Sequence, residues 1–279
     1  MRKFIKFFCV LALLLFVCSE LSATIQVKKK GVPSSKKISV TSFIDYPPFG
    51  IKDRQLINTV YQPLMDLYNE KYPAAMEYHV SNNYNDLILK VVDGDIDMLL
   101  GAYYNTDKYN GIKLIYPSIL NNPLILVTMP EKSLNIKSKN DLKNLKGAID
   151  SREHFADYVH KELKQYNIQQ FDNSEKLYEQ LFVGNVDYII TSKYYGAIEQ
   201  AKLGIRDQVS MSKSTLWDMP LFIGVSGVKH SAKRTENMMK EFLKLNQNTL
   251  REQIEQEIIK KIREADEAAI GIVPPAYVK

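Results

Sequence analysis

A short phrase occurs once in each half of this chain of 279 residues. Glycine is followed by an acid or amide, a β-branched residue, aspartate and an apolar run, at 94–100 and again at 184–190. Each copy follows an amphipathic stretch, 87–92 and 177–182 respectively. We therefore expect each glycine to end a helix in the left-handed conformation and each apolar run to form a buried strand. Two such units predict two similar α/β lobes with a cleft at the carboxyl ends of their strands.

The first residues have the layout of a secretory signal peptide. A basic start at 1–6 leads into the unbroken apolar run 7–17, and small residues follow it. The run is too short to span a bilayer comfortably, so we favour a cleaved signal over a permanent anchor. Cleavage fits after Ser19 or Ala23, and we assign residues 1–23 to the signal.

Both cysteines, Cys9 and Cys18, lie inside this segment. A chain cleaved after it would carry no thiol, which excludes a thiol nucleophile, a disulfide framework and a thiolate metal site. Lipidation of Cys18 as the first mature residue is the alternative, although Val17 stands where a small residue is usual.

The distribution of charge indicates neither a nucleic-acid-binding protein nor a strongly basic surface. The formal net charge is +5, and basic residues are scattered among acids, so we predict no nucleic-acid partner. Lysines cluster at 28–30 and 36–37, broken by glycine, proline and serine. We interpret residues 24–36 as a solvated tether, with attraction to an anionic lipid surface as the alternative.

Apolar periodicity predicts a βαβαβ half, a second half on the same plan, and two strands that cross between them. The first half is a strand at 38–42 ended by prolines 47 and 48, a helix across 56–68, a strand at 76–80, a helix at 84–92 and a strand at 97–101. The second half is a helix at 141–145, a strand at 147–150, a helix at 155–166, a strand at 168–171, helices at 175–182 and 193–203, and the second phrase between those two. The crossing strands, 124–128 and 221–226, are expected to form a hinge.

A long helical tail follows over 235–268, with a predicted break near 246–249. Its apolar positions need a surface to cover, which we expect to be the first lobe. A coiled-coil partner is the alternative for its last segment. The predicted domains are therefore 37–123 (first part of lobe 1), 124–220 (lobe 2) and 221–279 (hinge return and C-terminal helices on lobe 1).

Several phrases occur in the order and at the spacing of a known family. They are 46–50 (Tyr-Pro-Pro-Phe-Gly), 94–101, 115–118 (Ile-Tyr-Pro-Ser), 141–147 and 184–191. From about Lys37 to the helix near Glu257 the chain resembles the type II periplasmic solute-binding proteins of polar amino acid ABC importers. The resemblance implies a two-lobed α/β fold of the periplasmic-binding-protein-like II type, in which each lobe is a mixed β-sheet flanked by helices and a two-strand hinge joins them. It also implies a periplasmic monomer that captures a small polar solute, an amino acid or a related carboxylate, between its lobes without a cofactor and delivers it to an importer permease in the inner membrane.

The resemblance also implies two charged contacts to the ligand. In the family, an arginine a few residues beyond the first repeat strand binds the ligand's α-carboxylate. In this chain the strand leads through Gly101-Ala102-Tyr103, and the residue at the arginine's position is Lys108. Lysine keeps the charge but loses the planar fork, and a solvated loop lysine is the alternative. The family's acid for the ligand's ammonium is replaced by Ser192, which cannot balance a charge. Asp45 and Asp218 are candidates to supply a carboxylate.

Other residues near the expected cleft are candidate ligand contacts. Arg152 begins a helix and is suited to bind an anion, with a surface Arg152–Glu153 pair that caps this helix as the alternative. Aromatic side chains that suit the rim of the cleft are Tyr46, Phe49, Tyr103, Tyr104 and Trp217. Tyr46 and Trp217 are the better candidates because both lie in loops beside prolines.

Other chemistry finds little support. The histidines show no metal-ligand spacing except His154 with Asp157, which a solvated helix face also explains. No nucleophile elbow, phosphate loop or His-Glu-x-x-His motif occurs. We therefore predict a binding protein that is not an enzyme and holds no metal. A sensory module read by a membrane partner is the alternative, and a periplasmic enzyme of the same fold, like the dehydratases of prephenate-like substrates, is a weaker one.

Overall fold

The computed structural model describes residues 37–53, 56–72, 75–80, 83–104, 110–131, 136 and 138–278, with only the backbone of 51–53 and 56–58. The signal peptide and tether predicted for residues 1–36 lie outside the described residues. So does Lys108, the candidate carboxylate contact.

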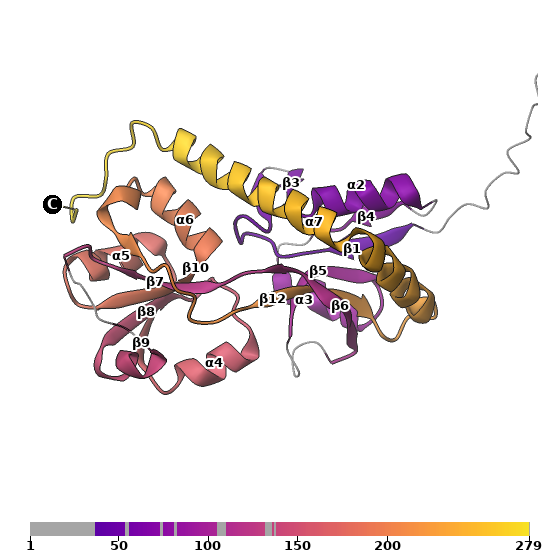
Figure 1. Cartoon of the computed structure of the whole chain (residues 1–279), viewed down its shortest axis with the longest axis horizontal. Coiled ribbons are helices and arrows are strands. Elements are labelled where there is room, and N and C mark those ends of the chain that lie inside the picture. Colours follow the sequence, from indigo (N-terminus) through magenta and orange to yellow (C-terminus); the bar gives the residue numbers. More distant parts are fainter. Residues whose placement is uncertain are drawn as a thin grey trace, which may run out of the picture. The chain divides into compact units, whose positions relative to one another are not determined.

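Lobe 1 is built on a five-stranded mixed sheet of order β4-β1-β5-β12-β6. The strand β1 pairs in parallel with β4 and β5, whereas β12 runs antiparallel to β5 and β6. Helices α2 and α3 flank the sheet, and β2 and β3 form a separate hairpin (Figure 1). The elements are β1 (Ile38–Thr41), β2 (Ile51–Asp53), β3 (Leu56–Asn58), α2 (Gln62–Lys71), β4 (Met76–Tyr78), α3 (Tyr84–Val92), β5 (Met98–Tyr103), β6 (Ile112–Asn121) and β12 (Pro220–Ser226).

Lobe 2 repeats this plan with a sheet of order β11-β7-β10-β8-β9. The strands β9, β8 and β10 are parallel, and β7 runs antiparallel to β10 and β11. Its elements are β7 (Leu124–Thr128), the 3₁₀ helix η1 (Lys139–Asn144), β8 (Lys146–Asp150), α4 (Asp157–Leu163), β9 (Asn167–Phe171), α5 (Ser174–Phe182), β10 (Tyr188–Ser192), α6 (Lys193–Lys202), the 3₁₀ helix η2 (Arg206–Gln208) and β11 (Ser210–Met211). The predicted fold of two mixed sheets flanked by helices is confirmed.

Two antiparallel segments connect the lobes. The chain leaves lobe 1 at the end of β6 and returns in the segment before β12. The backbone N–H of Asn122 donates to Met219 O at 2.9 Å, and that of Leu124 donates to Trp217 O at the same distance. The hinge is therefore two-stranded, as expected. The strands β7 and β12 themselves, however, belong to the sheets of lobe 2 and lobe 1.

The repeated phrase forms the same joint in both lobes. Gly94 and Gly184 follow α3 and α5 with φ angles of 84° and 77°, which confirms the left-handed residue predicted at each helix end. Asp97 donates its N–H to Ser39 O at 3.0 Å, and its carboxylate accepts the N–H of Ser39 at 2.9 Å. Asp187 contacts Lys146 in the same way, at 2.7 and 2.9 Å. Each aspartate thus fastens the start of its own strand to the start of a neighbouring one.

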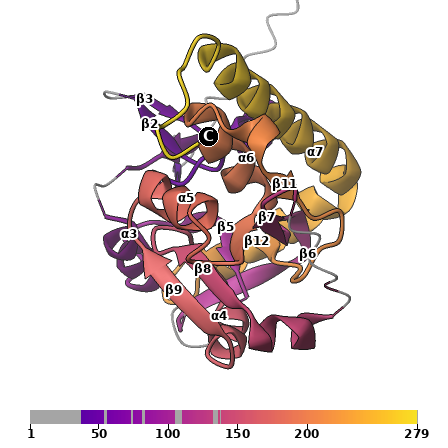
Figure 2. The same ribbon diagram turned by 90° about the vertical axis from the view of Figure 1, so that its left-hand side faces the viewer.

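The C-terminal helix α7 (Ala232–Ala268) is continuous, so the predicted break near 246–249 is wrong. Asparagine often interrupts a helix because its amide competes with the backbone. Here the amide of Asn246 is engaged, since it donates to Phe242 O at 2.7 Å and accepts from Lys71 of α2 at 2.9 Å. The prediction placed this helix on lobe 1, but the helix also extends beyond that lobe. It passes alongside α6, and Asp266 pairs with Arg206 of lobe 2 (Figure 2).

Three further boundaries differ from the prediction. The helix expected across 56–68 begins only at Gln62, because 56–58 forms β3. The helix expected over 155–166 is limited to 157–163, and the long strand β6 was not predicted as an element. Short apolar runs fit a helix and a strand equally well, which explains the first of these differences.

Candidate ligand-binding site

The two strands that carry the repeated phrase meet through one asparagine of the hinge. Tyr103 ends β5 in lobe 1 and Ser192 ends β10 in lobe 2. Asn122 lies between them and is fully buried. Its Nδ2 donates to the Tyr103 hydroxyl at 2.8 Å, and its Oδ1 accepts from Ser192 Oγ at 2.5 Å. The carboxyl ends of the two sheets therefore lie close together, as expected for a ligand site in an open α/β fold.

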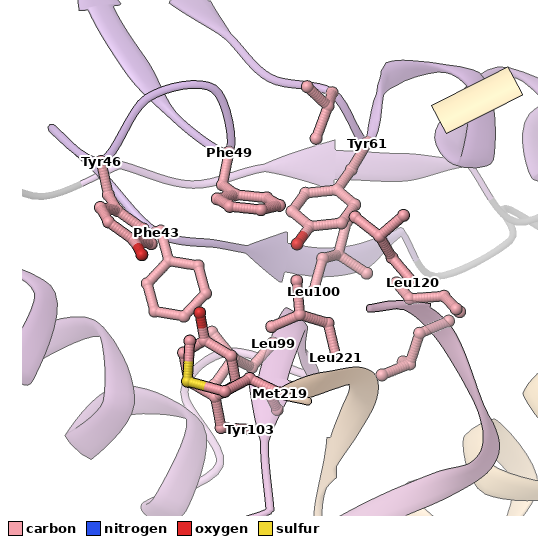
Figure 3. Close-up of a cluster of buried hydrophobic side chains, with 14 of the residues drawn as sticks. Phe43, Tyr46, Phe49, Tyr61, Leu99, Leu100, Tyr103, Leu120, Met219 and Leu221 are labelled. Atoms are coloured by element: carbon pink, nitrogen blue, oxygen red, sulfur yellow. The ribbon is translucent and has the colours of Figure 1, made fainter. Parts of the chain in front are cut away.

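Tyr46 reaches this point from the loop after β1. Its ring stacks on Tyr195 of lobe 2 and on Phe49, with centroid distances of 5.3 and 5.6 Å. Its hydroxyl accepts from Asn122 Nδ2 at 3.3 Å and lies 3.5 Å from Glu153 Oε2, to which it donates. Figure 3 shows the rings of Tyr46 and Phe49 beside Phe43, with Tyr103 near them. Tyr46 therefore connects lobe 1 to the hinge and to lobe 2.

Glu153, in the loop between β8 and α4, places a carboxyl group at the centre of the site. The residue is 5% exposed. Oε2 accepts the backbone N–H of Ser192 at 2.8 Å, whereas the buried Oε1 has no hydrogen-bond partner. Burial raises the pKa of this carboxyl well above its ordinary value of 4.5, and the nearby Asp150 and Glu199 raise it further. Glu153 thus takes up a proton far more readily than an exposed glutamate.

Two more buried carboxylates lie beside Glu153, on the lobe 2 side. They are Asp150 at the end of β8 and Glu199 on α6, and Ser174 Oγ lies 3.0 and 2.7 Å from them. Arg152 forms a two-point ion pair with Asp150, at 3.0 and 2.5 Å, and lies 3.7 Å from Glu199. Burial would raise the pKa of Asp150, but the hydrogen bonds from Arg152 hold it below its ordinary value. The guanidinium is therefore engaged by carboxylates of its own lobe and does not form the expected surface pair with Glu153.

Aromatic rings of lobe 1 surround a histidine of lobe 2. The imidazole of His154 stacks on Phe43 at 5.2 Å, and Tyr84 lies at 4.6 Å. The Tyr46 ring meets its edge at 5.2 Å. The two lobes are in direct contact through these rings.

The structure brings together some of the predicted site residues. Tyr46, Phe49, Tyr103 and Ser192 lie in one cluster with Asn122. Gly101 and Ala102 lie on β5 behind it, and Gly101 has a φ of 82° and faces the Tyr61 hydroxyl.

The other candidates lie elsewhere. Trp217 donates to Glu162 of α4 at 2.6 Å, with Lys139 over its ring, so its contacts are to lobe 2. Asp45 and Asp218 are exposed, and Asp218 accepts from Asn121.

Glu153, Asn122 and His154 belong to this cluster but are not among the site residues predicted from the sequence. The sequence indicates Glu153 only as part of a surface pair and His154 only through its spacing from Asp157. A usable signal was the position of Glu153 just after the strand β8, at the carboxyl edge of a sheet.

Within the described residues, no group of histidine, cysteine, aspartate or glutamate side chains is arranged to hold a metal ion. Across the same part of the chain, no helix combines the length and apolar character needed to cross a bilayer.

No protein-family model matches the chain, and no curated protein matches it. Solved structures do resemble it. A protein from Wolinella succinogenes in complex with lysine, assigned as the binding component of an ABC transporter, has a TM-score of 0.63 at 15% identity, covering 81% of this chain and 95% of its own. A histidine kinase sensor domain similar to periplasmic binding proteins has a TM-score of 0.60 at 13% identity, covering 87% and 99%. An ancestral arginine-binding protein bound to arginine has a TM-score of 0.56 at 18% identity, covering 82% and 99%.

These likenesses, together with the two mixed sheets and the two-strand hinge, define the class of fold. The chain has the two-lobed α/β fold of the type II periplasmic binding proteins. Identities this low show the fold alone.

Proposed function

We propose that this protein is a periplasmic solute-binding protein that captures a small polar solute, an amino acid or a related compound, between its lobes and delivers it to an ABC importer. The observation that supports this most is the cluster of Tyr46, Asn122, Glu153 and Ser192, in which lobe 1, the hinge and lobe 2 each contribute polar atoms to one buried point. Solved structures of this fold include a protein assigned as an ABC transporter binding component, in complex with lysine, and an ancestral arginine-binding protein bound to arginine.

Capture would proceed by hinge closure. Two backbone segments of the hinge cross between the sheets, and α7 packs along both lobes. A solute that touches both lobes favours the closed state. The closed state then presents a combined surface of both lobes to the importer. Catalysis is not part of the proposal.

A sensory module is the second candidate. The histidine kinase sensor domain matches 87% of this chain, compared with 81% and 82% for the two amino-acid-binding structures. An adjacent permease and ATPase gene would favour transport, whereas an adjacent kinase or cyclase gene would favour sensing.

Thermal unfolding in the presence of single solutes tests solute capture. We expect at least one amino acid, amine or dicarboxylate to raise the melting temperature of the protein and of Lys244→Ala, an exposed control on α7. The same solute should stabilise Ser192→Ala much less. The proposal is wrong if no small solute raises the melting temperature and X-ray scattering shows no closure.

A further inference from the structure

Two of the three buried carboxyl groups at the site have cationic partners. Asp150 pairs with Arg152, and Glu199 lies 2.6 Å from Lys202 and 3.7 Å from Arg152. Arg152 forms its two-point pair with Asp150, and no described lysine or arginine contacts Glu153. An anion that entered here would therefore find both cations engaged by carboxylates, whereas a cation would find the Glu153 carboxyl group without a cationic partner.

Glu153 itself carries an unused acceptor. Oε1 is buried and has no partner, which costs free energy for as long as it stays unmet. The hydrogen bond that joins this carboxyl group to lobe 1, from the hydroxyl of Tyr46, is 3.5 Å long, the outer limit of a hydrogen bond. A hydrogen-bond donor on a ligand would satisfy Oε1. At Oε2 it would displace only the weak hydrogen bond from Tyr46.

Aromatic rings line the same point from both lobes. Phe43, Tyr46 and Phe49 come from lobe 1, and Tyr195 of lobe 2 stacks on Tyr46. The faces of such rings carry partial negative charge and attract cations, most strongly where water is excluded. Rings beside a buried carboxyl group form the chemical environment that recognises an organic cation.

We propose that the inter-lobe site recognises the positively charged group of its solute, and that an organic amine or quaternary ammonium ion without any carboxylate is a sufficient ligand. The proposal rests on the proposed function, since it names the solute class of that same site. The rings of the two lobes touch, so the lobes part to admit the cation and close around it.

Binding also moves a proton. Glu153 is held toward its neutral form by burial and by Asp150 and Glu199. A cation beside it favours the carboxylate, so Glu153 releases its proton to solvent as the ligand binds. The carboxyl groups that face Glu153 are Asp150 and Glu199, and the phenols that face it are those of Tyr46, Tyr178 and Tyr195. Burial raises the pKa of each of these phenols above its ordinary value, so none of them supplies this proton.

Calorimetric titration with choline, putrescine and glutarate tests this proposal. We expect one of the two cations to bind and glutarate not to bind. Titrations in two buffers of different ionisation enthalpy, repeated between pH 5 and pH 8, should show proton release over the part of this range in which Glu153 is protonated before the ligand binds. Glu153→Gln should weaken cation binding at least about tenfold and abolish the proton release, whereas Glu175→Gln, an exposed glutamate on α5, should change neither.

The outcomes separate the two proposals. Binding of glutarate or of other carboxylates alone would overturn the cation assignment and leave solute capture intact. If no solute of any class binds, solute capture itself fails. Should Glu153→Gln not fold, the proton release of the parent decides, because a cation that binds without releasing a proton contradicts the role of Glu153.

Discussion

The backbone N–H of Ser192 donates to the carboxyl group of Glu153 across 2.8 Å. Resemblance to amino acid-binding proteins implied a carboxylate at position 192, and the chain has serine there. A carboxyl group nevertheless lies at this point, because the side chain of Glu153 reaches it from a neighbouring loop of the same lobe.

Stability should depend on pH through Glu153. Its pKa is raised in the folded state, so the neutral form favours folding below pH 4.5, and this contribution is lost as pH rises from 4.5 toward the folded pKa. We expect Glu153→Gln to remove this part of the pH dependence and to raise the free energy of unfolding at pH 8 by about 1 to 3 kcal/mol. Urea unfolding of the parent and of Glu153→Gln at pH 5 and pH 8 measures this difference in the free energy of unfolding. Parallel pH profiles of parent and variant would contradict a neutral Glu153.

Asn122 should be far more important than its neighbour Asn121. Asn122→Ala leaves the buried hydroxyls of Tyr103 and Ser192 without this partner, which should cost about 2 to 3 kcal/mol. Asn121 is exposed and contacts Asp218, so Asn121→Ala should cost less than about 1 kcal/mol. Denaturant unfolding of the two variants makes the comparison. Equal losses would mean that Asn122 does not join the two sheets.

Alanine substitutions at two glycines, Gly101 and Gly271, distinguish the cost of steric crowding from the cost of backbone strain. A Cβ on Gly101 would lie 2.1 Å from the Tyr61 hydroxyl, whereas one on Gly271 would meet nothing within 4 Å, and both have left-handed φ angles, 82° and 86°. Gly271→Ala should lower the free energy of unfolding by about 1 kcal/mol or less. Gly101→Ala should lower it by roughly 3 kcal/mol or more, because a clash is added to the strain. Similar losses in thermal unfolding would show that Tyr61 yields easily.

The sequence predicted the parts of this fold that depend on local pattern. The glycine, the aspartate and the apolar run of each repeat are contiguous, so their helix end and strand could be inferred directly, and so could most other elements. The break expected in α7 failed because the partner of Asn246 is Lys71, which is remote in the chain. No local rule shows that such an amide is already engaged.

The site was predicted less completely than the fold. Tyr46, Phe49, Tyr103 and Ser192 follow strands or turns that the pattern marks, and the structure places them together. Glu153 was missed because its role depends on a loop conformation that buries its side chain, while the adjacent Arg152 turns to Asp150. In the sequence, Arg152 and Glu153 resemble a surface ion pair. Only the pairing of the preceding strand β8 with β10 shows that Glu153 lies next to Ser192.

Lobe closure can be measured directly because the only cysteines are Cys9 and Cys18. With both replaced by serine, Asp86→Cys on α3 and Glu175→Cys on α5 place one exposed spin label on each lobe. Pulsed electron resonance then gives the distance between the lobes with and without solute. If the lobes close on a solute, the distribution of inter-lobe distances should be broad or centred at a longer distance without solute. It should become narrower and shift to a shorter distance when a stabilising solute is added. An unchanged distribution with a solute that demonstrably binds would contradict capture by closure of the lobes.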